Sequence, residues 1–138
     1  MPFVVNYLAV VGAAVAAFVI GMVWYSPLLF GKAWSAAHGY TPEKVATMKA
    51  GGMGKAYAAS LIGSLVTALV IGILVDRMDV LTALGGAKVG GLAWLGFAAP
   101  IGLSANLFSD KPFSLWLIDT GYQLVYLIAM GLILAKWG

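Results

Sequence analysis

We predict an all-α integral membrane protein with four transmembrane helices, on three observations. The chain has 138 residues, of which 62% are hydrophobic and 9% charged, against about 25% charged in an average soluble domain. A soluble domain of this length leaves too much surface exposed to hide so many apolar side chains. Four apolar runs are each long enough to cross the roughly 30 Å hydrocarbon core of a bilayer. We therefore expect the lipid bilayer as partner and a single four-helix domain over residues 1–138.

The first apolar run covers about residues 3–30 and carries no charge. We do not expect a signal peptide here, because "MPFVVN" lacks the basic residues that precede a signal-peptide core. The run ends in "WYSPLLFGKAW", residues 24–34. Pro27 has no N–H, so the carbonyl of Val23 needs another donor. Tyrosine, glutamine or asparagine side chains of other helices, water or a cation would meet that need. The indoles of Trp24 and Trp34 are expected to anchor the chain at the membrane interface.

The loop of residues 31–55 contains one predicted short helix on the membrane surface. Thr41 is a good N-cap, Pro42 suits the first helical position, and Glu43 favours the positive end of the helix dipole. His38 precedes this helix, and we expect it to be solvated; a pH-sensing role is the alternative.

The second, third and fourth spans are predicted at about residues 56–75, 82–108 and 113–135. Lys88 lies in the third, and it can snorkel to the boundary because enough apolar residues follow it.

Asp119, in the fourth span, cannot be placed outside the membrane in the same way. Residues 120–135 give roughly 24 Å of helix, which is too short to span without the turns that precede Asp119. An intramembrane carboxylate is a candidate functional group. The alternative is a hydrogen bond that holds a neighbouring helix.

Small residues recur at every fourth position of the second span. This spacing lets helix backbones approach closely in lipid, within one chain or between chains. Since four helices bury little interior, we expect a homo-oligomer. The row comprises Ala56, Ser60, Ser64, Ala68 and Gly72.

Several polar and aromatic side chains should share one half of the membrane, because four helix ends meet on one side. These side chains form a candidate polar intramembrane cluster. An aromatic belt with interhelical hydrogen bonds is the alternative reading. The cluster comprises Tyr25, Ser26, Pro27, Asn106, Asp119, Tyr122 and Gln123.

Composition argues against several function classes. The chain has no cysteine and one histidine, so we expect no metal site and no cofactor. The net charge of +3 comes from scattered lysines, which indicates topology and lipid headgroups rather than nucleic acid. We expect no enzyme, because Ser26 has no evident base partner and no Gly-rich phosphate loop is present.

Lysine and arginine bias predicts the orientation. The first and third loops carry more positive residues than the second loop and the C-terminal tail, so we expect a cytoplasmic first loop and both termini outside. The first group is Lys32, Lys44, Lys49, Lys55 and Lys111, and the second is Arg77, Lys88 and Lys136.

Three segments carry a resemblance to a known family: "WYSPLLFGKAW", "WLGFAAP" (residues 94–100) and "SLWLIDTGYQLVYLIAMGLILAKW" (residues 114–137). Over nearly the whole chain the sequence resembles small bacterial membrane proteins catalogued as domain of unknown function 1761. The resemblance implies a four-helix protein of the bacterial inner membrane and no settled activity. It also implies an asparagine at the position of Asp119, which favours a hydrogen-bonding role for that side chain.

The functional expectation is a small oligomeric channel or transporter for an ion or small solute. The polar face of the fourth span and Asp119 favour it. The alternative is a non-catalytic accessory or structural subunit that binds lipid or a larger complex, which the low charge and the small-residue row favour.

Overall fold

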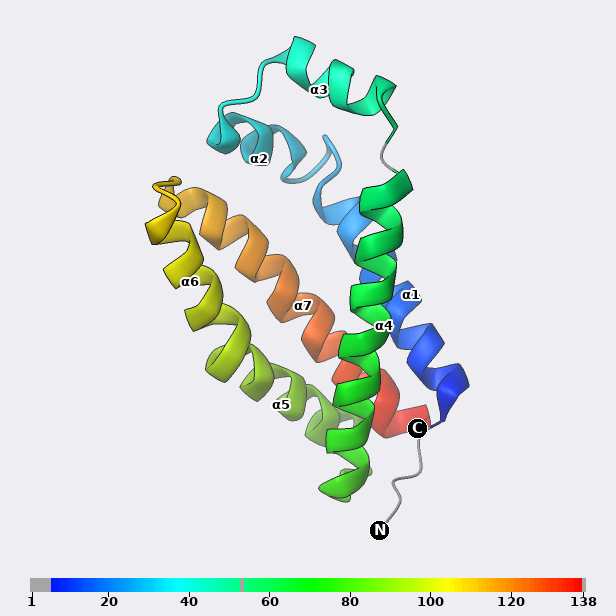
Figure 1. Ribbon diagram of the computed structural model, residues 1–138. Coiled ribbons are helices and arrows are strands. Elements are labelled where there is room, and N and C mark those ends of the chain that lie inside the picture. Colours follow the sequence, from blue (N-terminus) through cyan, green and yellow to red (C-terminus); the bar gives the residue numbers. More distant parts are fainter. Residues whose placement is uncertain (1–5, 53, 138) are drawn as a thin grey trace.

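The computed structural model describes residues 6–52 and 54–137 and confirms the predicted fold class. These residues form an all-α bundle with four helices long and apolar enough to cross a membrane (Figure 1). The third is continuous in the chain but changes helix type, from α-helical to π-helical and back. The four candidate spans are α1 (Tyr7–Trp24), α4 (Gly54–Arg77), the composite of α5 (Ala83–Ala93), η1 (Trp94–Ala98) and α6 (Ala99–Phe108), and α7 (Phe113–Trp137).

Helix α1 is shorter than the predicted first span. Its start is capped by Asn6, whose side chain accepts hydrogen bonds from the Leu8 and Ala9 amides. Its end is Trp24, so the expected extension to residue 30 is wrong. The chain turns there instead, and the amide of Phe30 donates to the carbonyl of Trp24 at 3.0 Å. Residues 3–5 of the predicted span lie outside the described residues.

Two short helices, rather than one, lie between α1 and α4. The predicted helix is α3 (Pro42–Ala50), and Thr41 caps it as expected, its hydroxyl accepting from the Lys44 amide at 3.1 Å. The other, α2 (Gly31–His38), is capped at its C-terminus by Gly39, whose φ of 75° lies in the left-handed region. Both helices lie at the same end of the bundle (Figure 1). We call this the loop end, and we call the opposite end, where the described chain begins and ends, the terminus end.

The tightest helix contact joins α5 to α7 near the terminus end. The backbone of Gly86 lies against the backbone of Gly131, and Gly90 lies against the backbone of Leu127. A β-carbon at Gly86 or Gly90 would collide with these carbonyl groups. Small residues at helix contacts are the usual means of close packing in membranes, where lipid tails supply no hydrophobic force between helices.

The apolar core fills the half of the bundle toward the terminus end. Helices α1, α4, α5 and α7 all contribute to it, and alanine dominates the contribution of α1. A hydrogen bond from Asn6 Nδ2 to the carbonyl of Trp137, 2.8 Å long, joins the start of α1 to the end of α7. The core residues are Ala9, Val10, Ala13, Ala14, Ala17, Ala68, Ile71, Val75, Val89, Leu127, Met130 and Leu134.

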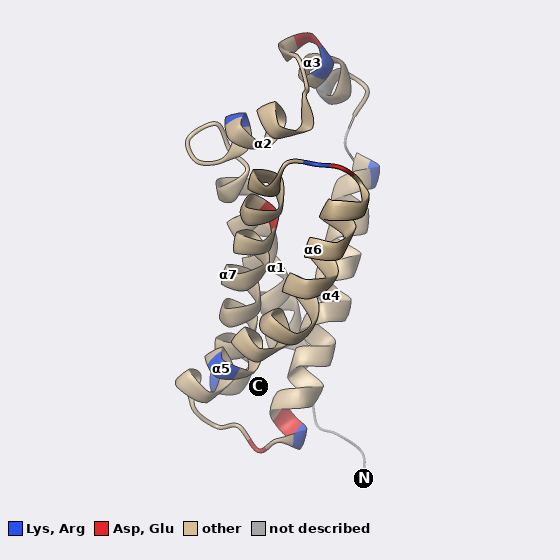
Figure 2. Ribbon diagram, turned by 90° about the vertical axis from the view of Figure 1, so that its left-hand side faces the viewer, with Lys and Arg blue, Asp and Glu red and all other residues tan. Residues whose placement is uncertain are grey.

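Charged residues gather at the two ends of the bundle, as a membrane-spanning arrangement requires (Figure 2). Lys88 is exposed near the start of α5, toward the terminus end. Asp119 lies about 9 Å along α7 from its start at Phe113, toward the loop end. The two side chains therefore lie toward opposite ends.

The contact between α5 and α7 generates a stability prediction. We expect Gly90→Ala to lower the free energy of unfolding by about 1–3 kcal/mol, because the added methyl group meets backbone that cannot move alone. Gly91→Ala is the matched control, since a β-carbon there has no neighbour within 4 Å; it should leave stability equal or up to about 1 kcal/mol higher. Reversible unfolding in mixed micelles measures both. Equal stability of the two variants would contradict the contact.

Candidate functional site

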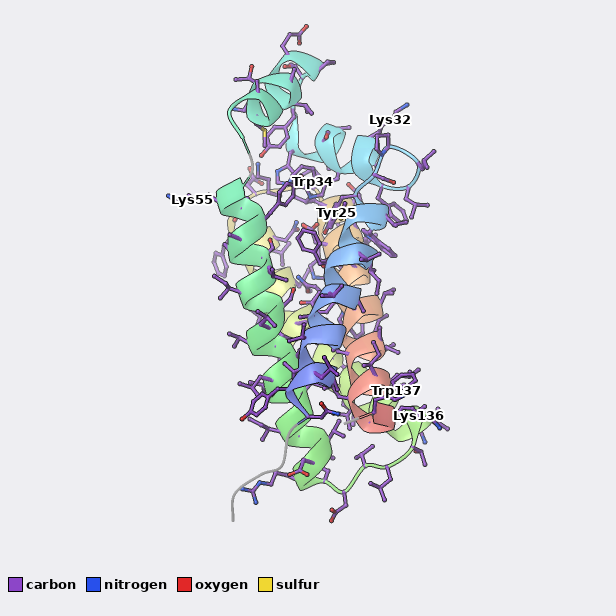
Figure 3. The ribbon with its side chains drawn as sticks, turned by 90° about the vertical axis from the view of Figure 1, so that its right-hand side faces the viewer. Tyr25, Lys32, Trp34, Lys55, Lys136 and Trp137 are labelled. Atoms are coloured by element: carbon purple, nitrogen blue, oxygen red, sulfur yellow. The ribbon has the colours of Figure 1, made fainter. Side chains whose placement is uncertain are left out.

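The segment after α1 meets α7 at the loop end. The hydroxyl of Tyr25 donates a hydrogen bond of 2.6 Å to Oδ1 of Asp119. The indole Nε1 of the preceding residue, Trp24, donates to the carbonyl of Ile118 at 2.9 Å. Figure 3 shows Tyr25 at the loop end of α1, beneath Trp34 of α2. Two consecutive side chains thus hold the end of α1 against one turn of α7.

Tyr122 extends this contact toward the middle of the bundle. Its hydroxyl donates to the carbonyl of Ala17 at 2.8 Å. Its ring lies edge-to-face with Tyr25, with 5.4 Å between the ring centroids. Gly21 makes room for it, because a β-carbon there would lie 2.9 Å from the Tyr122 hydroxyl oxygen. The tyrosine pair therefore depends on a small residue of α1.

Ser26 and Pro27 do not join this contact. The carbonyl of Val23, which Pro27 deprives of its helical donor, accepts a bond of 2.7 Å from the Ser26 hydroxyl and one of 3.2 Å from the Ser26 amide. The expected donors from other helices are therefore not needed. Pro27 itself is exposed.

The other predicted residues line a cavity between α6 and α7. Its volume is about 330 Å³, at the lower end of the range for small-molecule sites. Asn106, Asp119 and Gln123 all line it, so the structure brings these three cluster members to one space. His38 of α2 and Lys111, from the connection between α6 and α7, also line it. The remaining lining residues are Gly102, Ala105, Ser109, Leu115, Trp116 and Thr120.

Asn106 is the most constrained polar group of the cavity. The residue is 8% exposed. Its amide Nδ2 donates to the carbonyl of Pro112 at 3.1 Å, which fixes the side chain beneath the turn between α6 and α7. Among the described residues, its Oδ1 has no hydrogen-bond partner. A buried acceptor without a partner costs about 1–3 kcal/mol, so a donor that reached this oxygen would relieve that cost.

His38 is not the freely solvated loop residue that we expected. Its ring stacks on Tyr40, with centroids 4.9 Å apart, and meets Trp34 edge-on at 4.3 Å. Burial lowers the pKa of His38 below its ordinary value near 6.5, and Lys111 lowers it further. Asp119 acts in the opposite direction on this pKa. The ring is therefore neutral at pH 7, and it lies close to both charges of the cavity.

Two tryptophans set the spacing between the third span and α7. Trp94 donates its indole N–H to the carbonyl and the hydroxyl of Thr120, both at 2.9 Å. Trp116 donates in the other direction, to the carbonyl of Ala99 at 3.2 Å. An indole between two helices holds them farther apart than glycine does. The cavity begins next to these side chains.

Several residues of the site could not be recognised in the sequence. Thr120 and Trp94 lack a local pattern that marks a contact across two spans. Lys111 and His38 read as ordinary loop residues, and only the fold brings them to one cavity. Of the predicted interfacial anchors, Trp24 has its indole N–H bonded within the protein, Trp34 packs on Tyr25, and Lys88 lies near the other end of the bundle.

The arrangement can bind a small polar molecule. The cavity offers a carboxylate, an unpaired amide oxygen, an amine and an imidazole. Within residues 6–52 and 54–137, no group of three or more histidine, cysteine, aspartate or glutamate side chains could hold a metal ion. The interactions that the four groups lining the cavity supply are hydrogen bonds and charge contacts.

The bond between Tyr25 and Asp119 generates a second prediction. We expect Tyr25→Phe to lower the free energy of unfolding by about 1–2 kcal/mol, because the substitution removes a hydrogen bond between helices. Tyr7→Phe serves as control, since Tyr7 is 69% exposed. Unfolding of Tyr25→Phe, Asp119→Ala and the double variant in micelles completes a double-mutant cycle, because alanine has no oxygen to accept the Tyr25 bond. Strictly additive effects would contradict a direct bond.

The comparisons with known proteins bear on the whole chain. Neither a curated protein nor a solved structure matches it. One family profile, described as protein of unknown function (DUF1761), matches residues 8–135, which is nearly the full length. The chain is therefore a member of the DUF1761 family of proteins of unknown function.

Proposed function

We propose that this membrane protein is a transporter that binds a small polar solute in the cavity between α6 and α7. The observation that carries the proposal is the difference between the two halves of the bundle. Toward the terminus end, alanines and glycines pack the helices into an apolar core. Toward the loop end, a cavity with polar groups opens between two of the spans.

A transporter explains this difference better than a channel does. A channel needs a polar path through both halves, whereas the residues below the cavity on α7 include Leu127, Met130 and Leu134 of the apolar core. Alternating access needs a binding site that is open toward one side and closed toward the other. The cavity at the loop end above a closed core matches one state of that cycle.

The third span contains a candidate hinge for the transition. The π-helical turn η1 separates α5 from α6, and Pro100 is the second residue after it. π-Helical turns and prolines are common causes of helix kinks and are frequent at functional sites. Figure 1 shows that α5 and α6 run in different directions. Helix α5 packs closely on α7 through its glycines, whereas α6 borders the cavity, so we expect α6 to be the part that moves.

Binding without chemical conversion is part of this proposal. The cavity offers hydroxyl groups from Ser109 and Thr120, and Thr120 accepts a bond from Trp94. In the part of the chain that the structure describes, no hydrogen bond joins either hydroxyl to His38 or Asp119 as a nucleophile would require. We therefore infer a non-enzymatic role.

We further infer a homo-oligomer with its loop end in the cytoplasm. The small-residue row of α4 is exposed at Ala56 and Ser60, and a β-carbon at Gly63 would have no neighbour within 4 Å. This face could receive a second copy, which native mass spectrometry from nanodiscs would detect. Lysine bias favours the cytoplasm for the loop end, and accessibility of terminal tags in intact cells tests that orientation. Cytoplasmic termini would overturn it.

Flux measurements test the transport proposal. Purified protein in liposomes should carry at least one member of a panel of small amines, amino acids, phosphate esters, Na⁺ and K⁺ above the rate of protein-free vesicles. We expect Asp119→Asn to reduce that flux about tenfold or more, because it removes the charge within the cavity. Lys32→Gln, which changes a charge on α2 away from the cavity lining, should leave flux unchanged.

Two outcomes would contradict the proposal. One is the absence of flux for the whole panel. The other is equal flux of wild type and Asp119→Asn. A stoichiometric partner in gentle detergent together with absent flux would favour an accessory subunit instead.

A further inference from the structure

The charges of the cavity are separated rather than paired. Asp119 lies within the span, whereas Lys111 lies in the connection between α6 and α7. Among the described residues, no ion pair joins Lys111 to Asp119 within 4.0 Å, although both line the same cavity of about 330 Å³. His38 lines it as well, and both charges act on the pKa of its ring. A ligand that reaches from one charge to the other would complement both.

We propose that the cavity binds a phosphate ester of ethanolamine, with the primary ammonium on Asp119 and Asn106 and the phosphate on Lys111 and His38. The chemistry is the same in a free phosphate ester and in the headgroup of phosphatidylethanolamine. The inference rests on the proposed function, in that it takes this cavity as the ligand site, and it names the ligand class.

The acceptors of the cavity indicate where the ammonium group of the ligand would bind. A primary ammonium carries three donors and no acceptor. Asn106 is 8% exposed, and its Oδ1 is buried and lacks a partner among the described residues. The Asp119 carboxylate accepts one bond from Tyr25, and a carboxylate has sites for about three more. Trp116, whose N–H is bonded to Ala99, adds an aromatic wall beside a cation.

The donors of the cavity indicate where the phosphate group of the ligand would bind. Lys111 offers three N–H donors and a full charge, and a neutral His38 ring offers one N–H. Lysine binds phosphate as a point charge. Because Asp119 and Lys111 line one cavity without pairing with each other, neither a simple cation nor a simple anion would complement both, whereas a molecule with opposite charges on a short chain would.

The apolar surroundings fit a headgroup source as well. Large apolar side chains are exposed on both sides of the turn between α6 and α7, beside the cavity. Acyl chains of a lipid whose headgroup occupies the cavity would lie against them. These residues are Leu107 at 65% exposure, Phe108 at 94% and Phe113 at 54%.

Calorimetric titration tests the inference on the full chain in nanodiscs of phosphatidylcholine and phosphatidylglycerol. The probe is O-phosphoethanolamine. Ethanolamine and inorganic phosphate are the half probes, and phosphocholine is the matched control, because it keeps both charges but has no N–H donors. We expect O-phosphoethanolamine to bind about fivefold or more tightly than each of the other three, since a buried acceptor left unpaired costs a factor of roughly five to more than a hundred.

Variants locate the binding. Asp119→Asn and Lys111→Gln should each weaken O-phosphoethanolamine about tenfold or more, because each removes the charge that pairs with one end of the probe. Asp119→Asn keeps an oxygen for the Tyr25 hydroxyl, so the helix contact survives. Lys32→Gln is the control, since Lys32 also lies toward the loop end (Figure 3) but does not line the cavity. Tryptophan fluorescence confirms that each variant is folded.

The inference would be overturned by absent binding, by equal affinity for phosphocholine, or by affinity that neither Asp119→Asn nor Lys111→Gln changes. Phosphatidylethanolamine added to the nanodiscs distinguishes the sources: competition with the probe indicates a lipid headgroup, and unchanged affinity indicates a free ester. Binding of O-phosphoethanolamine without flux of any solute would contradict the transport proposal but support this inference. Flux of another solute without binding of O-phosphoethanolamine would support transport and contradict this inference.

Discussion

The backbone contact of α5 with α7 at Gly86, Gly90 and Gly131 determines the shape of the bundle. Two helices that touch at glycines near one end can diverge toward the other. Two tryptophans lie where the third span and α7 separate. Trp94 and Trp116 lie between these helices, and each donates a hydrogen bond to a backbone carbonyl of the opposite helix. Beyond them the separation is too wide for side chains to close, and a cavity results. Close packing at one end and a polar space at the other are therefore consequences of one contact.

Beyond the apolar core, hydrogen bonds rather than apolar packing hold the helices together. Toward the loop end, Trp24, Tyr25 and Tyr122 each donate a hydrogen bond across the contact between α1 and α7. Such bonds in membranes contribute only about 0.6–2 kcal/mol each, so this half of the protein is held less firmly than the apolar half. In the transport cycle that we propose, the part that opens and closes belongs in this less firmly held half. The Asp119 carboxylate has both roles, since it accepts from Tyr25 and also lines the cavity.

Much of the fold follows from the sequence, because a bilayer admits few solutions for long uncharged runs. The starts of α4 and α7 and the end of α6 agree with the predicted spans within two residues. The end of α1 does not, because hydropathy continues through Leu28 and Phe30 while Pro27 and the bonds around it turn the chain. Helix α2 has no cap pattern and only its terminal Gly39 marks it. For the site, topology placed Tyr25 near Asp119, but rotation of each helix decides that Asn106 faces α7 and that His38 and Lys111 reach the same cavity. Periodicity does not specify rotation between spans.

The account depends most directly on a water-filled cavity that is open at the loop end above a closed core. The chain has no cysteine, so single cysteines can report accessibility to a charged, membrane-impermeant thiol reagent. Ala105 lines the cavity, Ile101 is 66% exposed on the same helix α6 but outside the lining, and Ala13 is fully buried in the core. We expect Ala105→Cys to react from the loop side only, and Ile101→Cys and Ala13→Cys to stay unreactive from both sides. An unreactive Ala105→Cys, or one that reacts no faster than Ile101→Cys, would contradict the account.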